Sequence, residues 1–337
     1  MRRVLRRPSV WAALVVPLAV IVGVLWLFPS GDYLLLPDPA HPVGPLVQVP
    51  HAKPDRNGGG IYFVDIVIRR AKLFEDLFPG IHSGASLVPA GEINPPGAND
   101  SARRAQDLRE MRRSQSIAAA VALKALGYRV VARPTGVLVE EVDPTRPAAG
   151  KLEPTDVIVT VDGIQVRTPT QLRRAMARRR PGDVIRFGFH RGQSLRLVEI
   201  KTVPDPNDPK RPIVGILVGQ AADIRLPFKV RIDAGGVGGP SAGLAFALEV
   251  MEKLGRDVDR GYRVAATGEI GLDGSVGPIG GIKQKTFGVR DAHVDVFLVP
   301  AGENAAIARK HSGKVRIIAV QSFPQALQAL ATLKPKR

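Results

Sequence analysis

The sequence Gly235-Gly236-Val237-Gly238-Gly239-Pro240-Ser241-Ala242-Gly243 joins a strand-like segment, Phe228 to Ile232, to an apolar helix-like segment, Ser241 to Leu254. Its glycines permit a tight turn, and a serine at the start of a helix lies close to backbone N–H groups and the positive helix end. An oxyanion hole needs those groups. Ser241 is therefore a candidate nucleophile, and the candidate oxyanion region beside it is Gly239, Pro240 and Ala242.

Two plainer interpretations of this loop compete with catalysis. Serine is a preferred N-cap residue, and most serines at helix starts only cap the helix. The glycines also suggest a phosphate-binding loop, but no Gly-Lys-Ser/Thr follows Gly239, as a Walker motif would require. On its own, the loop does not decide between capping and catalysis.

A serine nucleophile needs a base. None of the six histidines lies in a readable triad context: His41, His51, His82, His190, His293 and His311. A second glycine-rich cluster, Gly277 to Lys285, offers Lys283 and Lys285 instead. A lysine can act as a base only if burial or a neighbouring cation lowers its pKa well below about 10.4. The residues alone do not separate the two lysines, and two surface lysines are the plainer interpretation.

Three segments, in this order along the chain, resemble the successive signatures of the Lon protease proteolytic domain: Gly239-Pro240-Ser241-Ala242-Gly243, Thr267-Gly268-Glu269-Ile270 and Gly280-Gly281-Ile282-Lys283-Gln284-Lys285. The resemblance implies that Ser241 is the nucleophile and Lys285 the base, with Lys283 as the fallback. It also implies that Thr267 orients the lysine amine by hydrogen bonding. The implied reaction is peptide-bond hydrolysis through an acyl-enzyme.

The resemblance has an upstream extension and two departures. Met111 to Ala120 resembles the helix that precedes the catalytic strand in Lon, which implies a proteolytic domain split by an insertion. Gly238 occupies the position, three residues before the serine, where the family usually has aspartate. No ATPase module accompanies the motifs in this sequence, so the expected hydrolysis is independent of ATP.

The inserted unit resembles a PDZ domain. Leu152 to Val166 follows the bacterial PDZ pattern, with Thr155 where glycine is common. PDZ domains bind peptides by strand addition, in which main-chain hydrogen bonds give affinity and side-chain pockets give selectivity. The resemblance implies a groove lined by Gly136, Val137, Leu138, Val139, Leu172 and Met176. The plainer interpretation of Leu172 and Met176 is that they belong to the core.

The N-terminal segment, Val10 to Phe28, carries no charged or strongly polar side chain. It would reach roughly 28 Å as a helix, close to the thickness of a hydrocarbon core. Trp11 and Trp26 fall near its ends, and four arginines precede it: Arg2, Arg3, Arg6 and Arg7. This pattern predicts a single transmembrane anchor with the N-terminus in the cytoplasm. A cleaved signal peptide is the alternative, although residues 28–32 offer no small-x-small cleavage site.

Composition limits the remaining classes. The chain has 337 residues, no cysteine and a formal net charge of +17. The lack of cysteine excludes a thiol nucleophile, a thiolate metal site and disulfides, and we expect no cofactor and no metal. The charge raises the question of nucleic-acid binding. We discount it, because aromatic residues make up only 5% of the chain and the arginines lie in helix-like runs such as residues 173–180.

The anchor, the PDZ-like unit and the Lon-like region together resemble the bacterial PDZ-containing Lon-like membrane proteases. We expect an α+β fold: a Lon-type proteolytic domain with an inserted PDZ domain, preceded by one transmembrane helix. The expected parts are residues 1–30 (cytoplasmic N-terminus and anchor), 31–128 (N-terminal strands and helix, the first part of the Lon-like domain), 129–204 (PDZ domain) and 213–335 (Lon-like domain).

The expected function is an ATP-independent serine endopeptidase, with its catalytic part outside the cytoplasmic membrane. Its expected partners are exported or misfolded proteins recruited by the PDZ domain, and the family resemblance implies homo-oligomeric rings. The competing hypothesis is a membrane-tethered peptide-binding scaffold whose protease-like domain is inactive, which Gly238 favours.

Overall fold

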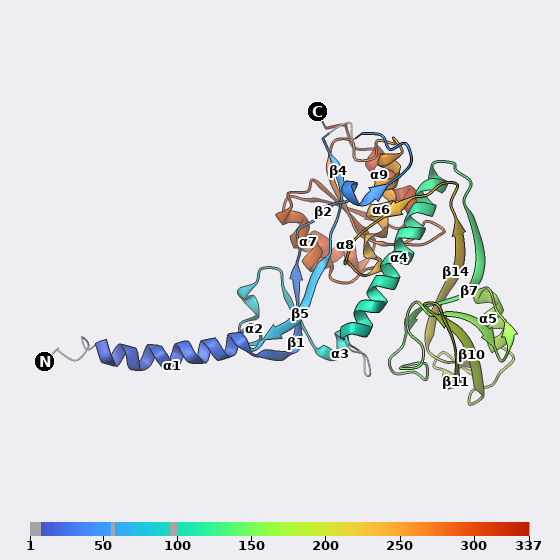
Figure 1. The fold of residues 1–337 in the computed structure, drawn as a ribbon, viewed down its shortest axis with the longest axis horizontal. Coiled ribbons are helices and arrows are strands. Elements are labelled where there is room, and N and C mark those ends of the chain that lie inside the picture. Colours follow the sequence, from blue (N-terminus) through green and yellow to red (C-terminus); the bar gives the residue numbers. More distant parts are fainter. Residues whose placement is uncertain (1–7, 55–57, 95–99, 337) are drawn as a thin grey trace.

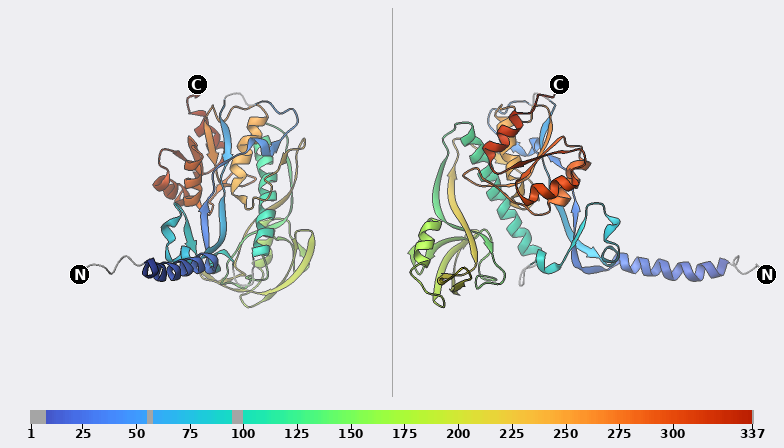
Figure 2. Two further views of the ribbon diagram at one scale, coloured as in Figure 1. Left: turned by 60° about the vertical axis from the view of Figure 1, so that its left-hand side comes forward. Right: turned by 180° about the vertical axis from the view of Figure 1, so that it is seen from behind.

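The computed structural model describes residues 8–54, 58–94 and 100–336 in a mixed α/β arrangement. Helix α1 (Pro8–Leu27) projects away from the rest of the molecule, and the long helix α4 (Asp100–Ala125) crosses its centre (Figure 1). A β-rich unit lies on one side of α4 and the α1 end of the molecule on the other, as Figure 2 shows from two further directions.

Helix α1 covers the apolar N-terminal segment, while the four arginines before it lie outside the described residues. In the part of the chain that the structure describes, no helix combines the length and the apolar character that a membrane span requires. The prediction of a transmembrane span is therefore not confirmed.

A small antiparallel sheet follows α1. Strand β1 (Pro29–Pro37) lies between β5 (Ile66–Lys72) and β6 (Ser86–Val88), and the sheet buries Leu34 and Ala71. Short helical segments connect the strands of this N-terminal part: η1 (Gly44–Leu46), α2 (Leu73–Leu77), η2 (Pro79–Ile81) and α3 (Ala90–Ile93).

The apolar run from Ile61 to Ile68 forms two strands, not one. Strand β4 (Gly60–Phe63) belongs to the central sheet, whereas β5 belongs to the N-terminal sheet, and Val64 and Asp65 make the bend between them. A continuous run of β-forming residues predicts extended structure but gives no sign of a change of sheet. Asp65 therefore lies at a junction that the sequence pattern does not reveal.

The central sheet has the order β2 (His41–Pro42), β4, β16 (Arg263–Ala266), β19 (Val296–Pro300) and β20 (Arg316–Val320). Strands β4, β16, β19 and β20 run parallel, and β2 is antiparallel to β4. Strands from before and after the β-rich unit thus share one sheet, so the β-rich unit is an insertion.

Helices cover both faces of this sheet because its strand residues alternate between two cores. Val264 and Ala266 pack with α4, α6 (Gly243–Lys253) and α9 (Phe323–Ala331). Ala265 faces the other way and packs with α7 (Ile282–Asp291) and α8 (Glu303–His311).

Short pairings complete this region. Strand β3 (Val47–Gln48) pairs with β15 (Arg231–Ile232), and β17 (Glu269–Ile270) pairs with β18 (Val276–Gly277). The predicted strand from Phe228 is thus reduced to its last two residues. The predicted helix from Ser241 begins as a 3-10 turn, η3 (Pro240–Ala242), and continues as α6.

The inserted unit is a sheet of order β11 (Ser194–Lys201), β10 (Val184–Arg191), β8 (Val157–Val161), β7 (Val131–Val142) and β14 (Ile216–Arg225). Helix α5 (Pro169–Met176) packs beside it, β9 (Ile164–Gln165) pairs with β8, and β12 (Val203–Asp205) forms a hairpin with β13 (Asp208–Ile213). The chain stays in this unit as far as Arg225, because β14 pairs along most of β7.

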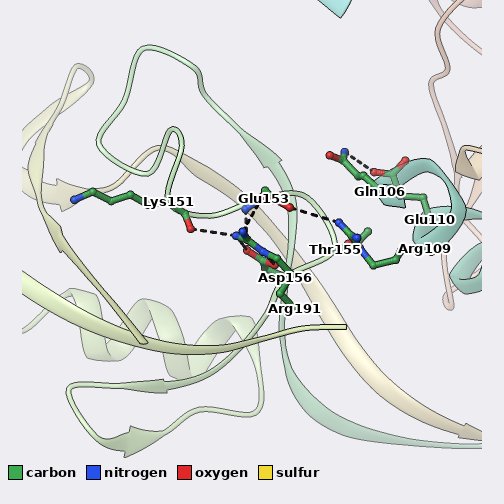
Figure 3. A network of polar contacts seen from close by, with 8 residues as sticks. All are labelled: Gln106, Arg109, Glu110, Lys151, Glu153, Thr155, Asp156 and Arg191. Carbon is green, nitrogen blue, oxygen red and sulfur yellow. Dashed lines mark hydrogen bonds and ion pairs between the residues drawn. The ribbon is translucent and has the colours of Figure 1, made fainter. Parts of the chain in front are cut away.

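One loop of the inserted unit faces α4 and is fixed by Arg191 (Figure 3). Arg191 donates to both carboxylate oxygens of Asp156, at 2.8 and 2.7 Å, and to Glu153 at 2.7 Å. Arg109 of α4 donates to Thr155 in the same loop at 3.0 Å. This network therefore supports the contact between α4 and the inserted unit.

Replacing Arg191 by methionine should lower the free energy of unfolding of the inserted unit by about 3 kcal/mol. Asp156 is 0% exposed, and removing its partner leaves a buried carboxylate without a counter-charge. Urea titration of the full chain, followed by a probe in this unit, measures the loss. Arg186→Met is the matched control, because the Arg186–Glu199 pair is exposed on both sides and its loss should cost under about 1 kcal/mol. Equal losses in the two variants would contradict the prediction.

Candidate active site

Ser241 is held in place by hydrogen bonds from separate parts of the fold. Its backbone oxygen accepts from the N–H of Gly268 at 2.8 Å and from the hydroxyl of Thr267 at 3.1 Å. Ser114 of α4 donates to the preceding carbonyl, that of Pro240, at 2.9 Å. The loop that carries the serine is thus fixed against α4 and against the end of β16.

Lys285 reaches the serine from α7. Its side chain is 3% exposed, and its Nζ lies 2.6 Å from Ser241 Oγ and 3.3 Å from Thr267 Oγ1. Thr267 is fully buried. The structure therefore brings together the three side chains of the sequence hypothesis, Ser241, Thr267 and Lys285.

Burial lowers the pKa of Lys285 from 10.5 to about 8, and the charge of Asp65 opposes this shift. Desolvation penalises the charged form of a buried amine. A lysine in this environment is neutral in a substantial fraction of molecules slightly above neutral pH. A neutral amine at 2.6 Å can accept the hydroxyl proton of Ser241.

Lys283 has a different place in the structure. Its Nζ donates to the backbone oxygen of Ala85 at 2.9 Å and to Ser86 Oγ at 3.3 Å. The side-chain amide of Gln284 also donates to Ser86. Lys283 thus fastens α7 to β6, and the fallback base of the sequence hypothesis points away from the serine.

The predicted oxyanion region needs a correction. The N–H of Gly239 donates to the backbone oxygen of Asp107 at 2.8 Å, and Pro240 has no N–H to donate. Neither residue can therefore supply the donor. The next two backbone N–H groups of this loop are those of Ser241 and Ala242, at the N-terminal end of the helical segment.

Packing against α4 explains why position 238 is a glycine. A Cβ built on Gly238 would stand 2.5 Å from the Cβ of Asp107 on α4. Any residue with a side chain would therefore displace the loop or the helix at this point. In this structure, Asp107 occupies the space that a side chain at position 238 would need.

A cavity of about 410 Å³ adjoins the loop before the nucleophile, with Pro240 and Ile270 on one side and β7 of the inserted unit on the other. Arg113 of α4 lies in its wall, 3.7 Å from Glu269. Burial raises the pKa values of Glu269 and of Glu110. The space between the serine loop and the inserted unit is thus lined by partly buried carboxyl groups around one arginine.

The structure also corrects the predicted peptide groove. Gly136 to Val139 lie in β7, which is paired with β14 on one side, while Val137 and Leu138 also pair with β8 on the other. An interior strand has no edge to which a peptide could add. Among the described strands of this sheet, β11 and β14 are the two ends of the strand order, and β14 is the one next to β7. A cavity of about 550 Å³ lies between residues 216–218 of β14 and the predicted helix residues Leu172 and Met176.

A cluster of titratable side chains that no sequence motif indicates lies near Lys285. Asp38, His41 and Asp65 bring side-chain ligand atoms within 4.8 Å of one another, and His41 Nε2 lies 2.7 Å from Asp38 Oδ2. Burial raises the pKa of Asp65 to about 6, and the neighbouring Asp38 adds to this rise, while His41 and Lys285 oppose it. These residues are far apart from Lys285 in the sequence, so no motif spacing could reveal the cluster.

A second cluster of carboxyl groups, Glu252, Asp257 and Asp259, lies at the C-terminal end of α6. Glu252 Oε1 accepts from the N–H groups of Val258 and Asp259 at 2.5 and 2.7 Å. Since its oxygen already serves the following loop, we interpret this cluster as part of the protein scaffold.

Comparison with known proteins finds two matching regions in the chain. Residues 226–332 match the family model of the Lon protease (S16) C-terminal proteolytic domain, and residues 124–202 match that of the PDZ domain. The chain is 32% identical over 112 residues to Lon protease 2 of Bacillus subtilis (33% of this chain, 19% of that protein). It is 42% identical over 84 residues to Lon protease 1 of Sorangium cellulosum (24% of this chain, 10% of that protein). A solved PDZ domain of an SdrC-like protein from Listeria monocytogenes is 25% identical, with 25% and 87% of the two chains covered and a TM-score of 0.24.

The chain therefore carries a region similar to a PDZ domain, followed by a region similar to the proteolytic domain of Lon-type peptidases. Its match spans 19% or less of the length of the two curated Lon relatives named above.

Proposed function

We propose that the chain is an ATP-independent serine endopeptidase in which Ser241 is the nucleophile and Lys285 the general base. The observation that carries the proposal is the distance of 2.6 Å between Ser241 Oγ and the buried amine of Lys285. The match to the Lon proteolytic domain, which includes both residues, supports it further.

In the proposed reaction, the neutral amine of Lys285 accepts the hydroxyl proton of Ser241 while Oγ attacks the substrate carbonyl. Thr267, which contacts both the amine and the serine backbone, keeps the amine oriented. The N–H groups of Ser241 and Ala242 face the developing oxyanion. Lys285 then gives its proton to the leaving amine, and an acyl-enzyme on Ser241 remains for hydrolysis by water.

The PDZ domain would recruit exported or misfolded protein substrates. The edge strand β14 and the cavity next to Leu172 and Met176 support this part of the proposal, because a peptide could add to β14 as a further strand. The position of the catalytic part outside the cytoplasmic membrane and a ring-shaped oligomer stay predictions.

Replacing Ser241 by alanine in the full chain should reduce hydrolysis of casein, without ATP, by at least about a thousandfold. Ser116→Ala is the matched control, since its hydroxyl is exposed and bonds only to its own helix at Arg112. The control should keep the activity of the unaltered chain. Hydrolysis that persists in Ser241→Ala would refute Ser241 as the nucleophile. A requirement for ATP in the unaltered chain would refute the ATP-independence.

The competing scaffold hypothesis has little left in its favour. The one sequence feature that favours it is Gly238, and the close approach of Asp107 explains the glycine by packing. The short distance between Ser241 and Lys285 is also what an active dyad needs. We therefore retain only the enzymatic proposal.

A further inference from the structure

A cavity of about 830 Å³ lies between α4 and the inserted unit. Its lining comes from α4, from the strands β7 and β14, and from the segment that leads out of β14 into β15. Arg109 and Thr155, which are hydrogen-bonded to each other across this contact (Figure 3), both belong to the lining. The cavity therefore lies at the junction of the inserted unit with the rest of the chain.

The charges that line this cavity are unbalanced. The arginine and lysine side chains of the lining are Arg109, Arg112, Arg113, Lys229 and Arg231. Among the described residues of the lining, Asp223 is the only one with a carboxylate, and Arg225 lies 3.3 Å from it. The cavity is therefore strongly cationic, and its one carboxylate already has a partner.

Three of these cations have no counter-charge in the described part of the chain. Arg112 lies on α4, Lys229 lies between β14 and β15, and Arg231 lies in β15, and all three are exposed and form no ion pair with a described residue. They differ in this from Arg109 and Arg113, which lie 3.5 and 3.7 Å from glutamates. Unpaired cations can receive the carboxylates of a ligand without first giving up an ion pair of their own.

The rest of the lining favours a polypeptide as the ligand. Ile117 and Leu138 are buried side chains of the lining, so the cavity offers apolar surface beside its cations. No phenylalanine, tyrosine or tryptophan is found among the described residues that line it. Proteins that bind single-stranded nucleic acids stack the bases on such rings. The combination of apolar and cationic side chains instead matches a peptide that carries acidic residues.

This cavity also borders the space beside the nucleophile. It shares Arg113, Ile117, Leu138 and Thr155 with the cavity of about 410 Å³ that adjoins Pro240. The glutamates that line this second cavity are Glu110, Glu140, Glu141 and Glu269. Because like charges repel, an acidic segment of a substrate is directed to the cationic cavity and kept out of the acidic one.

We infer that the cationic cavity is a docking site for an acidic segment of the polypeptide substrate, held by Arg112, Lys229 and Arg231. The inference rests on the proposed function, since it names the class of substrate that the peptidase takes. The segment docks away from the cleaved bond, because the glutamates of the second cavity lie nearer to the catalytic loop. Exported or misfolded chains with a run of acidic residues are then preferred over chains without one.

Peptide binding to the full chain with Ser241→Ala tests the inference, because this change leaves the peptide intact. The two probes are a fluorescent peptide rich in glutamate and its counterpart with glutamine at the same positions, both with an amidated C-terminus. Fluorescence anisotropy at an ionic strength of about 0.05 M should show that the glutamate peptide binds roughly tenfold more tightly. The advantage should shrink at about 0.5 M, where exposed charges are screened.

The triple change Arg112→Gln, Lys229→Gln and Arg231→Gln should reduce this advantage to within about twofold. Its matched control is Arg309→Gln, Lys310→Gln and Arg316→Gln, which removes the same charge from exposed side chains of α8 and β20. The control should keep most of the advantage. An equal loss in the two triple variants would show that only the net charge attracts the peptide and would overturn the inference, as would equal binding of the two peptides by the chain with Ser241→Ala alone.

Two further comparisons separate this inference from its alternatives. A single-stranded oligonucleotide of the same charge is the third probe, and the inference would be overturned if the cavity variant weakened its binding but not that of the glutamate peptide. Since binding needs no hydrolysis, a cavity that discriminates between the peptides in a chain that never cleaves casein would refute the proposed function alone. A chain that cleaves casein but binds both peptides equally would refute the inference alone.

Discussion

Lys285→Met should reduce kcat/KM for peptide hydrolysis by at least about a thousandfold, because it removes the only described base within hydrogen-bond distance of Ser241 Oγ. Methionine fills a similar volume without a titratable group, so the buried site next to Thr267 stays packed. Steady-state hydrolysis of a fluorogenic peptide by the full chain measures the effect.

Lys283→Met is the matched control for this change, two residues earlier in the same helix. The change removes the hydrogen bonds of the Lys283 amine to Ala85 and Ser86 and should lower the free energy of unfolding by about 1 kcal/mol. Hydrolysis should stay within a fewfold of that of the unaltered chain. If Lys283→Met abolished hydrolysis and Lys285→Met did not, the assignment of the base would be wrong.

Hydrolysis should also depend steeply on pH. The base must be neutral, and burial sets the pKa of Lys285 to about 8. The logarithm of kcat/KM should therefore rise with a slope of about one below pH 8 and level off above it, so that pH 6 gives roughly one hundredth of the plateau. A pH profile with a thermally stable peptide substrate measures this, and a rate that is flat or falling from pH 6 to pH 9 would contradict the proposed role of the amine.

Much of the site could be predicted from the sequence, because its parts lie at the ends of regular elements. Ser241 lies in the 3-10 turn that leads from the glycine-rich loop into the buried helix α6, and Thr267 directly follows the central strand β16. Lys285 lies one turn into α7, after Gly281, whose φ of 66° marks the helix start. Such positions carry strong local signals, and their order along the chain matched a known family.

The features of the fold and the site that could not be predicted depend on contacts that leave no local pattern in the sequence. Asp65 lies inside an apolar run that reads as one strand, yet the chain changes sheets at that residue. Strand β14 follows a proline-rich hairpin and looks like the start of the next domain, but it returns to pair with β7. The choice between Lys283 and Lys285 likewise needed the direction of each side chain on α7.

The donors of the oxyanion region could not be predicted from the sequence for a different reason. The position of Gly239 and Pro240 beside the serine predicts that they belong to this region, but a donor is useful only if its N–H is present and not already engaged in another hydrogen bond. Proline has no N–H, and the N–H of Gly239 is bonded to Asp107 of a helix more than a hundred residues earlier. Only the folded arrangement reveals such competition.

The most direct test of the dyad is covalent labelling of the full chain with a fluorophosphonate probe at pH 9, followed by mass spectrometry of the peptides. An activated serine reacts with such a probe, whereas an ordinary N-cap serine does not. The account predicts one modified residue, Ser241, and loss of the label in Lys285→Met but not in Lys283→Met. A chain left unlabelled at Ser241, or labelled equally after removal of Lys285, would contradict it.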